Sequence, residues 1–128
     1  MSPDESRRNL LVLAHAEGEL VVLGPIGFAA RETEECRAYR ALAADRNAIA
    51  ELQGEITALA TRGNPVRRIY AVLLLRIVDA AAARAILETM ASSDEPCAIT
   101  QGGCNIPTGT LGATARALLG REPNPWLG

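Results

Sequence analysis

The sequence predicts an all-α fold of five to six short helices in antiparallel hairpins, with one small β-hairpin near residues 97–106. Apolar residues recur at the three- and four-residue spacing of a helix along most of the chain. Ser, Thr, Asn or Asp stands directly before several of these stretches, where an N-cap residue belongs. The connecting loops are short, and short loops favour antiparallel neighbouring helices.

The first predicted helix begins after Ser2 and ends near Gly18. Ser2 can cap the first turn, and Pro3 stands where a missing N–H does no harm. The apolar stretch 20–30 follows. It either extends this helix or forms a linker broken at Gly24-Pro25. The apolar stripe of the helix consists of Leu10, Leu13 and Ala14.

Two further helices are predicted in the next thirty residues. One covers residues 33–44 and has Thr33 as its N-cap. The other covers residues 48–61, has Asn47 as its N-cap and is closed by Gly63. We expect these two helices to form a hairpin.

The fourth helix is the clearest element, because Asn64 can cap it and Pro65 occupies its first position. It is apolar on nearly every side, which indicates a buried central helix. Its apolar stripe consists of Val66, Ile69, Tyr70, Leu73, Leu74 and Ile77.

Arg76 is the exception in this helix, since it falls between Val72 and Ile69 on an otherwise apolar side. A buried arginine is costly unless it is paired. We therefore expect a structural salt bridge or carbonyl contacts, with Glu88 or Asp79 as partner. The alternatives are a side chain that reaches solvent along its apolar stem and, third, a ligand-binding arginine.

The last part of the chain supplies two more helices. Asp79 is the predicted N-cap of the fifth, and Thr110 that of the sixth, which Gly120 ends. The predicted β-hairpin between them turns at Gly102-Gly103 with glycine at the positive-φ position. These elements predict a single helical domain over residues 1–120 and a Pro-rich C-terminal tail over residues 121–128.

The segment GNPVRRIYAVLLLRIVDAAAARAIL, residues 63–87, resembles a HEAT-type helical repeat. It has a proline at the start of a helix, a buried apolar stripe, an Asp-capped turn and a second amphipathic helix. With Phe28-Ala29, Tyr39 and the GGC of residues 102–104, the layout resembles small bacterial HEAT-like proteins. The resemblance implies an all-α scaffold that binds other macromolecules, and it implies no catalytic residue. A compact bundle is the alternative, because a solenoid usually needs three repeats.

Composition excludes several classes of function. The 128 residues carry a net charge of −2, and all 13 basic residues are scattered arginines. A nucleic-acid-binding surface needs clustered positive charge and stacking aromatics, so no nucleic-acid partner is expected. No apolar segment reaches the length of a membrane span.

The cysteines and the N-terminus indicate the compartment. Three cysteines are too few for a disulfide framework, so reduced thiols in a cytoplasmic protein are expected. The alternative is export, because SRRNLLVLA at residues 6–14 looks like a twin-arginine signal. His15, Glu17 and Glu19 interrupt its apolar segment.

Cys97 and Cys104 are the candidate chemical site, and several interpretations are open. Zinc needs about four ligands in closely spaced pairs, and the C-x6-C spacing with only distant Cys36 and His15 does not provide them. A disulfide across the hairpin and a reactive Cys104 before the last helix are alternatives. Packing as small buried side chains is favoured, so we predict no metal.

Gly102, Gly103 and Thr110 form a second candidate, a turn leading into a helix whose backbone N–H groups could bind an anion. The lysine and the strand–loop–helix context of a phosphate-binding loop are missing. A turn and a helix entry are therefore expected, and no cofactor is predicted.

These observations favour a non-enzymatic protein–protein interaction or scaffold module of HEAT-like type. No set of catalytic residues is present, since one histidine with no local partner makes no Ser–His–acid arrangement. Stacked helix pairs offer ridged surfaces for a protein partner or for self-association. The alternative is a small redox or nucleophilic thiol protein that uses Cys104.

Overall fold

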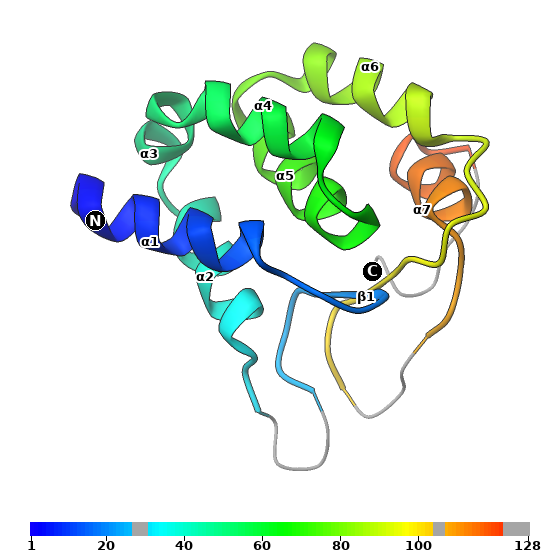
Figure 1. Ribbon diagram of the computed structural model, residues 1–128, viewed down its shortest axis with the longest axis horizontal. Coiled ribbons are helices and arrows are strands. Elements are labelled where there is room, and N and C mark those ends of the chain that lie inside the picture. Colours follow the sequence, from blue (N-terminus) through cyan, green and yellow to red (C-terminus); the bar gives the residue numbers. More distant parts are fainter. Residues whose placement is uncertain (27–30, 104–106, 122–128) are drawn as a thin grey trace.

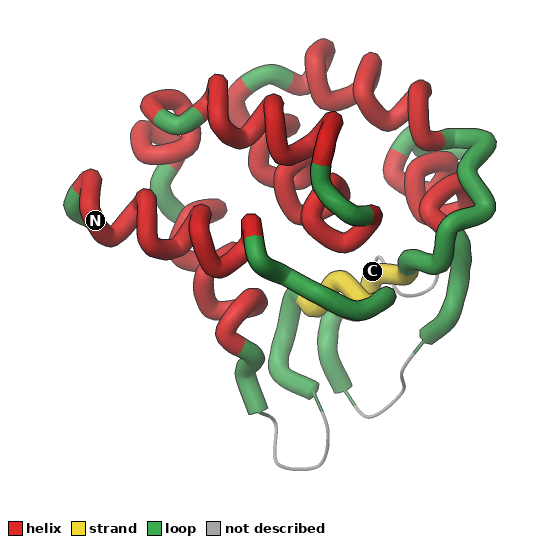
Figure 2. Tube along the Cα trace, in the orientation of Figure 1, coloured by secondary structure: helices red, strands yellow, loops and turns green. Residues whose placement is uncertain are grey.

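The structure is a computed structural model that describes residues 1–26, 31–103 and 107–121. The described part is mostly helical with one small parallel sheet, which confirms the predicted fold class (Figures 1 and 2). Its elements are α1 (Pro3–Ala14), β1 (Leu20–Val22), α2 (Glu34–Ala43), α3 (Arg46–Glu51), α4 (Gln53–Arg62), α5 (Pro65–Val78), α6 (Ala80–Met90), β2 (Ala98–Thr100) and α7 (Leu111–Leu118).

Local capping fixes where most helices begin. In five helices the predicted N-cap side chain accepts a hydrogen bond from the backbone N–H three residues later. These five predicted starts are confirmed. The N-caps are Ser2, Thr33, Asn64, Asp79 and Thr110.

The predicted helix over residues 48–61 with Asn47 as its N-cap is wrong. The structure has two helices there, because Asp45 caps α3 through a 3.1 Å bond from the Ala48 N–H, and α3 ends before Leu52. Gly54 lies just after the break and weakens the helix at this point. The break turns Leu52 into the core, where it is 4% exposed.

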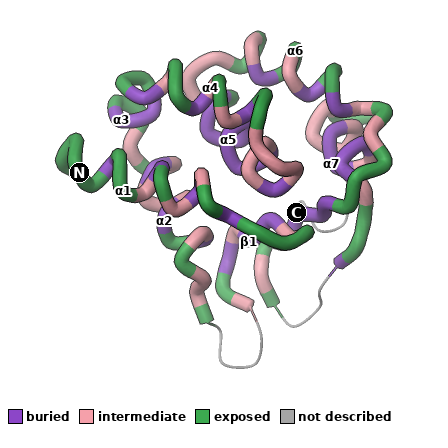
Figure 3. The backbone as a smooth tube through the Cα atoms, in the orientation of Figure 1, coloured by how far each residue is buried: buried purple, intermediate pink, exposed green. Residues whose placement is uncertain are grey.

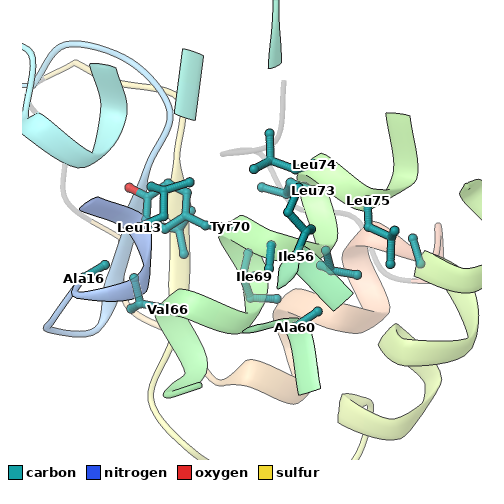
Figure 4. Close-up of a cluster of buried hydrophobic side chains, with 14 of the residues drawn as sticks. Leu13, Ala16, Ile56, Ala60, Val66, Ile69, Tyr70, Leu73, Leu74 and Leu75 are labelled. Atoms are coloured by element: carbon teal, nitrogen blue, oxygen red, sulfur yellow. The ribbon is translucent and has the colours of Figure 1, made fainter. Parts of the chain in front are cut away.

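The central helix is α5, as its apolar sequence predicts. It packs against α4 on one side and α6 on the other, and it also contacts α1, α2, α3 and β1. Figure 3 shows most of its length buried, and Figure 4 shows its side chains in the core. The buried residues of α5 are Val66, Ile69, Tyr70, Ala71, Val72, Leu73, Leu74 and Leu75.

The ambiguous stretch after α1 contains a strand. β1 pairs with β2 in parallel, with Leu20 beside Ala98 and Val22 beside Thr100. Residues 98–100 therefore pair with a distant segment, whereas a hairpin was predicted near 97–106. Residues 104–106, where that hairpin would return, lie outside the described part of the chain.

The Tyr70 side chain hydrogen-bonds to the edge of β1 that does not pair with β2. Its hydroxyl accepts a hydrogen bond from the Val22 N–H at 2.9 Å and donates one to the Val22 carbonyl at 3.0 Å. One side chain thus satisfies both groups of Val22 that a third strand would otherwise bind. This contact fixes the sheet to the middle of the helical core.

The twin glycines pack against the segment that follows β1. Gly102 and Gly103 have φ values of 117° and 91°, the positive values expected for a glycine turn. The Gly103 N–H donates to the Pro25 carbonyl at 2.9 Å. A Cβ atom on Gly24 would lie 2.1 Å from the Gln101 carbonyl oxygen. Two backbones cross here with no room for side chains.

The Pro-rich tail predicted over residues 121–128 is described only at Arg121, which makes an ion pair with Glu88 of α6. Gly120, the predicted end of the last helix, has a φ of 77°. A glycine at positive φ just past a helix is a common helix end.

Candidate functional site

An open apolar groove lies between α1 and α4. Its volume is about 470 Å3. Apolar side chains form its walls, and charged side chains lie at its ends. The lining residues are Arg7, Leu10, Leu11 and Ala14 from α1, and Glu55, Ala58, Leu59, Arg62 and Gly63 from α4 and its end.

Polar contacts at both ends show how α1 and α4 lie relative to each other. At one end the Arg7 guanidinium lies 3.5 Å from the Glu55 carboxylate. At the other end the Ala16 carbonyl accepts hydrogen bonds from the side chains of Asn64, at 3.0 Å, and Arg67, at 2.8 Å. The N-terminal part of α1 therefore faces the N-terminal part of α4, and the two helices run in the same direction (Figure 1).

The groove is hollow because several of its lining residues are small. Ala14 and Ala58 carry only methyl groups, and Gly63 has no side chain. The larger residues of both helices, such as Leu13 and Ile56, are turned into the core and fully buried. The core packing of α1 and α4 thus leaves a shallow apolar depression between them.

Leu11 stands beside this depression and is 56% exposed. A single exposed leucine is ordinary on a protein surface. Here it lines an apolar groove, so the two form one continuous apolar surface. Among the described residues, Met1 is the other large hydrophobic side chain with comparable exposure.

Charges of both signs surround the apolar surface. Arg7 and Glu55 close one end of the groove, and Arg62 lies near the other. Arg8 lies on the far side of Leu11, where it lines a second shallow hollow with Asp4. This distribution, an apolar centre with a charged rim, resembles the anatomy of protein–protein interfaces.

The predicted thiol site is described only in part. Cys104 lies outside the described residues, whereas Cys97 is a free, fully buried thiol. Burial raises the pKa of Cys97 to about 12, with a smaller contribution from the nearby Glu95 charge. Burial also raises the pKa of Cys36, which is free and fully buried. Neither thiol has the lowered pKa that a nucleophile needs.

We expect native-state alkylation to separate the cysteines. At pH 8, Cys36 and Cys97 should react with iodoacetamide at least ten times more slowly in the folded protein than in denaturant, since they are buried and protonated. Peptide mass spectrometry reports each site separately, and the protein unfolded in guanidinium chloride is the control. Rapid modification of Cys97 in the folded protein would contradict this expectation.

The backbone N–H groups of the predicted anion site already donate hydrogen bonds to acceptors within the protein. The N–H groups of the glycine turn and of the first residues of α7 each bond within the protein, so they do not point at a ligand. These bonds run from Gly102 to Thr100 Oγ1, Gly103 to the Pro25 carbonyl, Leu111 to the Glu95 carbonyl, Gly112 to the Ser93 carbonyl, and Ala113 to Thr110 Oγ1.

Arg76 is exposed, so the burial expected for it is not found. It lines a shallow hollow with Ala80 and Ala83 of α6, and these small residues leave its long side chain a route to water. Glu88, one of its expected partners, pairs with Arg121. The hydrogen bond from Arg121 and its charge hold the pKa of Glu88 below its ordinary value.

The described residues offer neither a metal site nor a membrane-spanning helix. Within residues 1–26, 31–103 and 107–121, no three His, Cys, Asp or Glu side chains lie close enough to hold a metal ion. His15 hydrogen-bonds through Nδ1 to the Leu11 carbonyl at 2.8 Å, at the C-terminal end of α1. No helix within those same ranges has the length and apolar character required to span a bilayer.

Comparisons with protein-family models, curated proteins and solved structures find no match for this chain. The proposed function therefore rests on the chemistry of the α1–α4 groove.

The groove between α1 and α4 was not predicted from the sequence. Its two walls come from helices about forty residues apart in the sequence. A local sequence pattern does not show that two such distant helices lie side by side. One signal was present, because Leu11 lies beside the apolar stripe of its helix and not within it. A large apolar residue out of phase with the core stripe indicates a second apolar surface.

Proposed function

We propose that this protein is a non-enzymatic interaction module of HEAT-like type, and that the α1–α4 groove binds a protein helix. The observation that carries the proposal is the exposed Leu11 beside an apolar groove of about 470 Å3. Helix-in-groove recognition places the apolar ridge of one helix into such a depression.

The packing of the helices supports the HEAT-like part of the proposal. α5 and α6 follow each other directly through Asp79 and pack together, as do α4 and α5. A row of consecutively packed helices exposes helix surfaces at its margins, and repeat scaffolds bind through such surfaces.

A cytoplasmic location belongs to the same proposal. Cys36 and Cys97 are free thiols, the state that reducing compartments maintain.

Site-specific photocrosslinking tests this function. A benzoylphenylalanine at position 58, in the groove wall, should give protein adducts of defined mass in cells that express the full chain. The same group at the exposed position 85, on α6, is the matched control. The adducts at position 58 should disappear when Leu11→Asp is added. Identical adducts at both positions, or none at position 58, would show that the groove is not a protein-binding surface.

A further inference from the structure

We infer that the α1–α4 groove binds an amphipathic helix of another protein that carries a carboxylate at one end of its apolar ridge, where the carboxylate pairs with Arg62. This inference rests on the proposed function, and it names the chemistry of the partner. It follows from the spacing of the residues that line the groove and from the charges at its two ends.

The two walls of the groove have the same spacing of residues. Each wall contributes four residues at positions i, i+3, i+4 and i+7, which lie along one side of a helix. They extend over about two turns, or about 10 Å. A partner helix with apolar side chains at the same intervals matches this length. The residues are Arg7, Leu10, Leu11 and Ala14 in α1, and Glu55, Ala58, Leu59 and Arg62 in α4.

The charges at the first end of the groove are matched within the protein. Arg7 of α1 and Glu55 of α4 form an ion pair at 3.5 Å. Arg8 and Asp4, which line the neighbouring hollow, carry opposite charges four residues apart on α1. This end of the groove therefore has no net charge, and a partner needs no charged residue to meet it.

Arg62 is the unmatched charge, and it lines the opposite end of the groove. It is exposed, and it makes no ion pair with any residue in the ranges 1–26, 31–103 and 107–121. Arg67, one turn further along the chain, is already paired with Glu17 at 2.5 Å. Glu17 is therefore engaged elsewhere, and the charge of Arg62 is left for a partner.

This unmatched charge distinguishes between partner helices. A docked helix removes water from the Arg62 guanidinium, and that loss is costly unless an acceptor replaces the water. A carboxylate supplies the acceptor and forms a charge-assisted hydrogen bond with the arginine. A lysine or arginine at the same place would bring like charges together. The groove therefore favours an acidic residue at this end of the apolar ridge.

Selection from a displayed peptide library tests the inference. The probe is a library of alanine-based helical peptides of about 18 residues, randomised along one ridge and at both of its ends. The wild-type protein, after removal of peptides that bind Leu11→Asp, should enrich apolar ridges with Asp or Glu at one end. Arg62→Glu should enrich Lys or Arg at that position. Arg84→Glu, at an exposed arginine of α6, is the matched control and should enrich the same peptides as the wild type.

Fluorescence anisotropy of one enriched peptide measures the contribution of Arg62. Arg62→Gln should weaken binding of the acidic peptide about three- to tenfold, and added salt should reduce this difference. The same peptide with glutamine in place of the acid should bind wild type and Arg62→Gln within about twofold of each other. Arg84→Gln is the control and should leave the binding of both peptides unchanged.

The outcomes separate this inference from the proposed function. If wild type and Arg62→Glu enrich the same apolar ridge without a charge preference, the carboxylate is wrong and the helix-binding groove stands. If the wild type enriches no ridge, the inference is overturned, and the proposed function stands only if position 58 gives protein adducts in cells. A wild-type dimer that Leu11→Asp dissociates would place a second copy in the groove and would also overturn the inference.

Discussion

Replacing Tyr70 by Phe is expected to lower the free energy of unfolding by about 2–4 kcal/mol. The hydroxyl of Tyr70 serves both the N–H and the carbonyl of Val22 in a buried position. Its loss leaves two buried backbone groups without a partner, while the aromatic ring and its packing remain. Urea or guanidinium denaturation of both proteins measures the difference.

Tyr39→Phe is the matched control. Tyr39 packs against Tyr70 with ring centroids 5.8 Å apart, and its hydroxyl makes no hydrogen bond within the described part of the chain. Its loss should change the free energy of unfolding by no more than about 0.5 kcal/mol. Equal effects of the two substitutions would show that the contact with Val22 contributes nothing.

The same hydroxyl makes stability depend on pH in alkaline solution. Burial raises the pKa of Tyr70 well above its ordinary value near 10, so the unfolded chain loses this proton at a lower pH than the folded protein. The corresponding stability is present below about pH 10 and is lost as the pH rises further. Tyr70→Phe should lose stability less steeply above pH 10, although Cys97 and Tyr39 keep part of the dependence.

Replacing Gly24 by Ala is the second large expected effect, a loss of about 3 kcal/mol or more in the free energy of unfolding. The added Cβ atom would lie 2.1 Å from the carbonyl oxygen of Gln101, a backbone atom that cannot turn aside. The crossing of residues 24–25 with residues 101–103 would have to open, and the hydrogen bond from Gly103 to Pro25 would be strained.

Gly54→Ala provides the opposite control. Gly54 lies in α4, and a Cβ atom there meets no atom within 4 Å. Alanine is the better helix former, so this substitution should raise the free energy of unfolding by about 0.5–1 kcal/mol. Thermal or chemical denaturation compares both variants with the wild type. A Gly24→Ala protein as stable as the wild type would mean that the two backbones do not cross as closely as described.

Local chemistry explains why most helices were predicted correctly. The Asn64 side chain bonds to the N–H of Arg67, and Thr110 does the same for Ala113, so the signal spans only three residues. The prediction failed at residues 48–61, where two capping residues, Asp45 and Asn47, stand two positions apart. Both residue types are favoured at N-caps, so the local sequence does not distinguish between them.

The sequence by itself determined five helix starts, the burial of α5 and the all-α class, because capping and apolar periodicity act between residues a few positions apart. Only the tertiary structure decided the pairing of β1 with β2, the exposure of Arg76 and the groove between α1 and α4. Each of these depends on side chains distant in the chain, and their proximity follows from how whole helices pack, which no local pattern encodes.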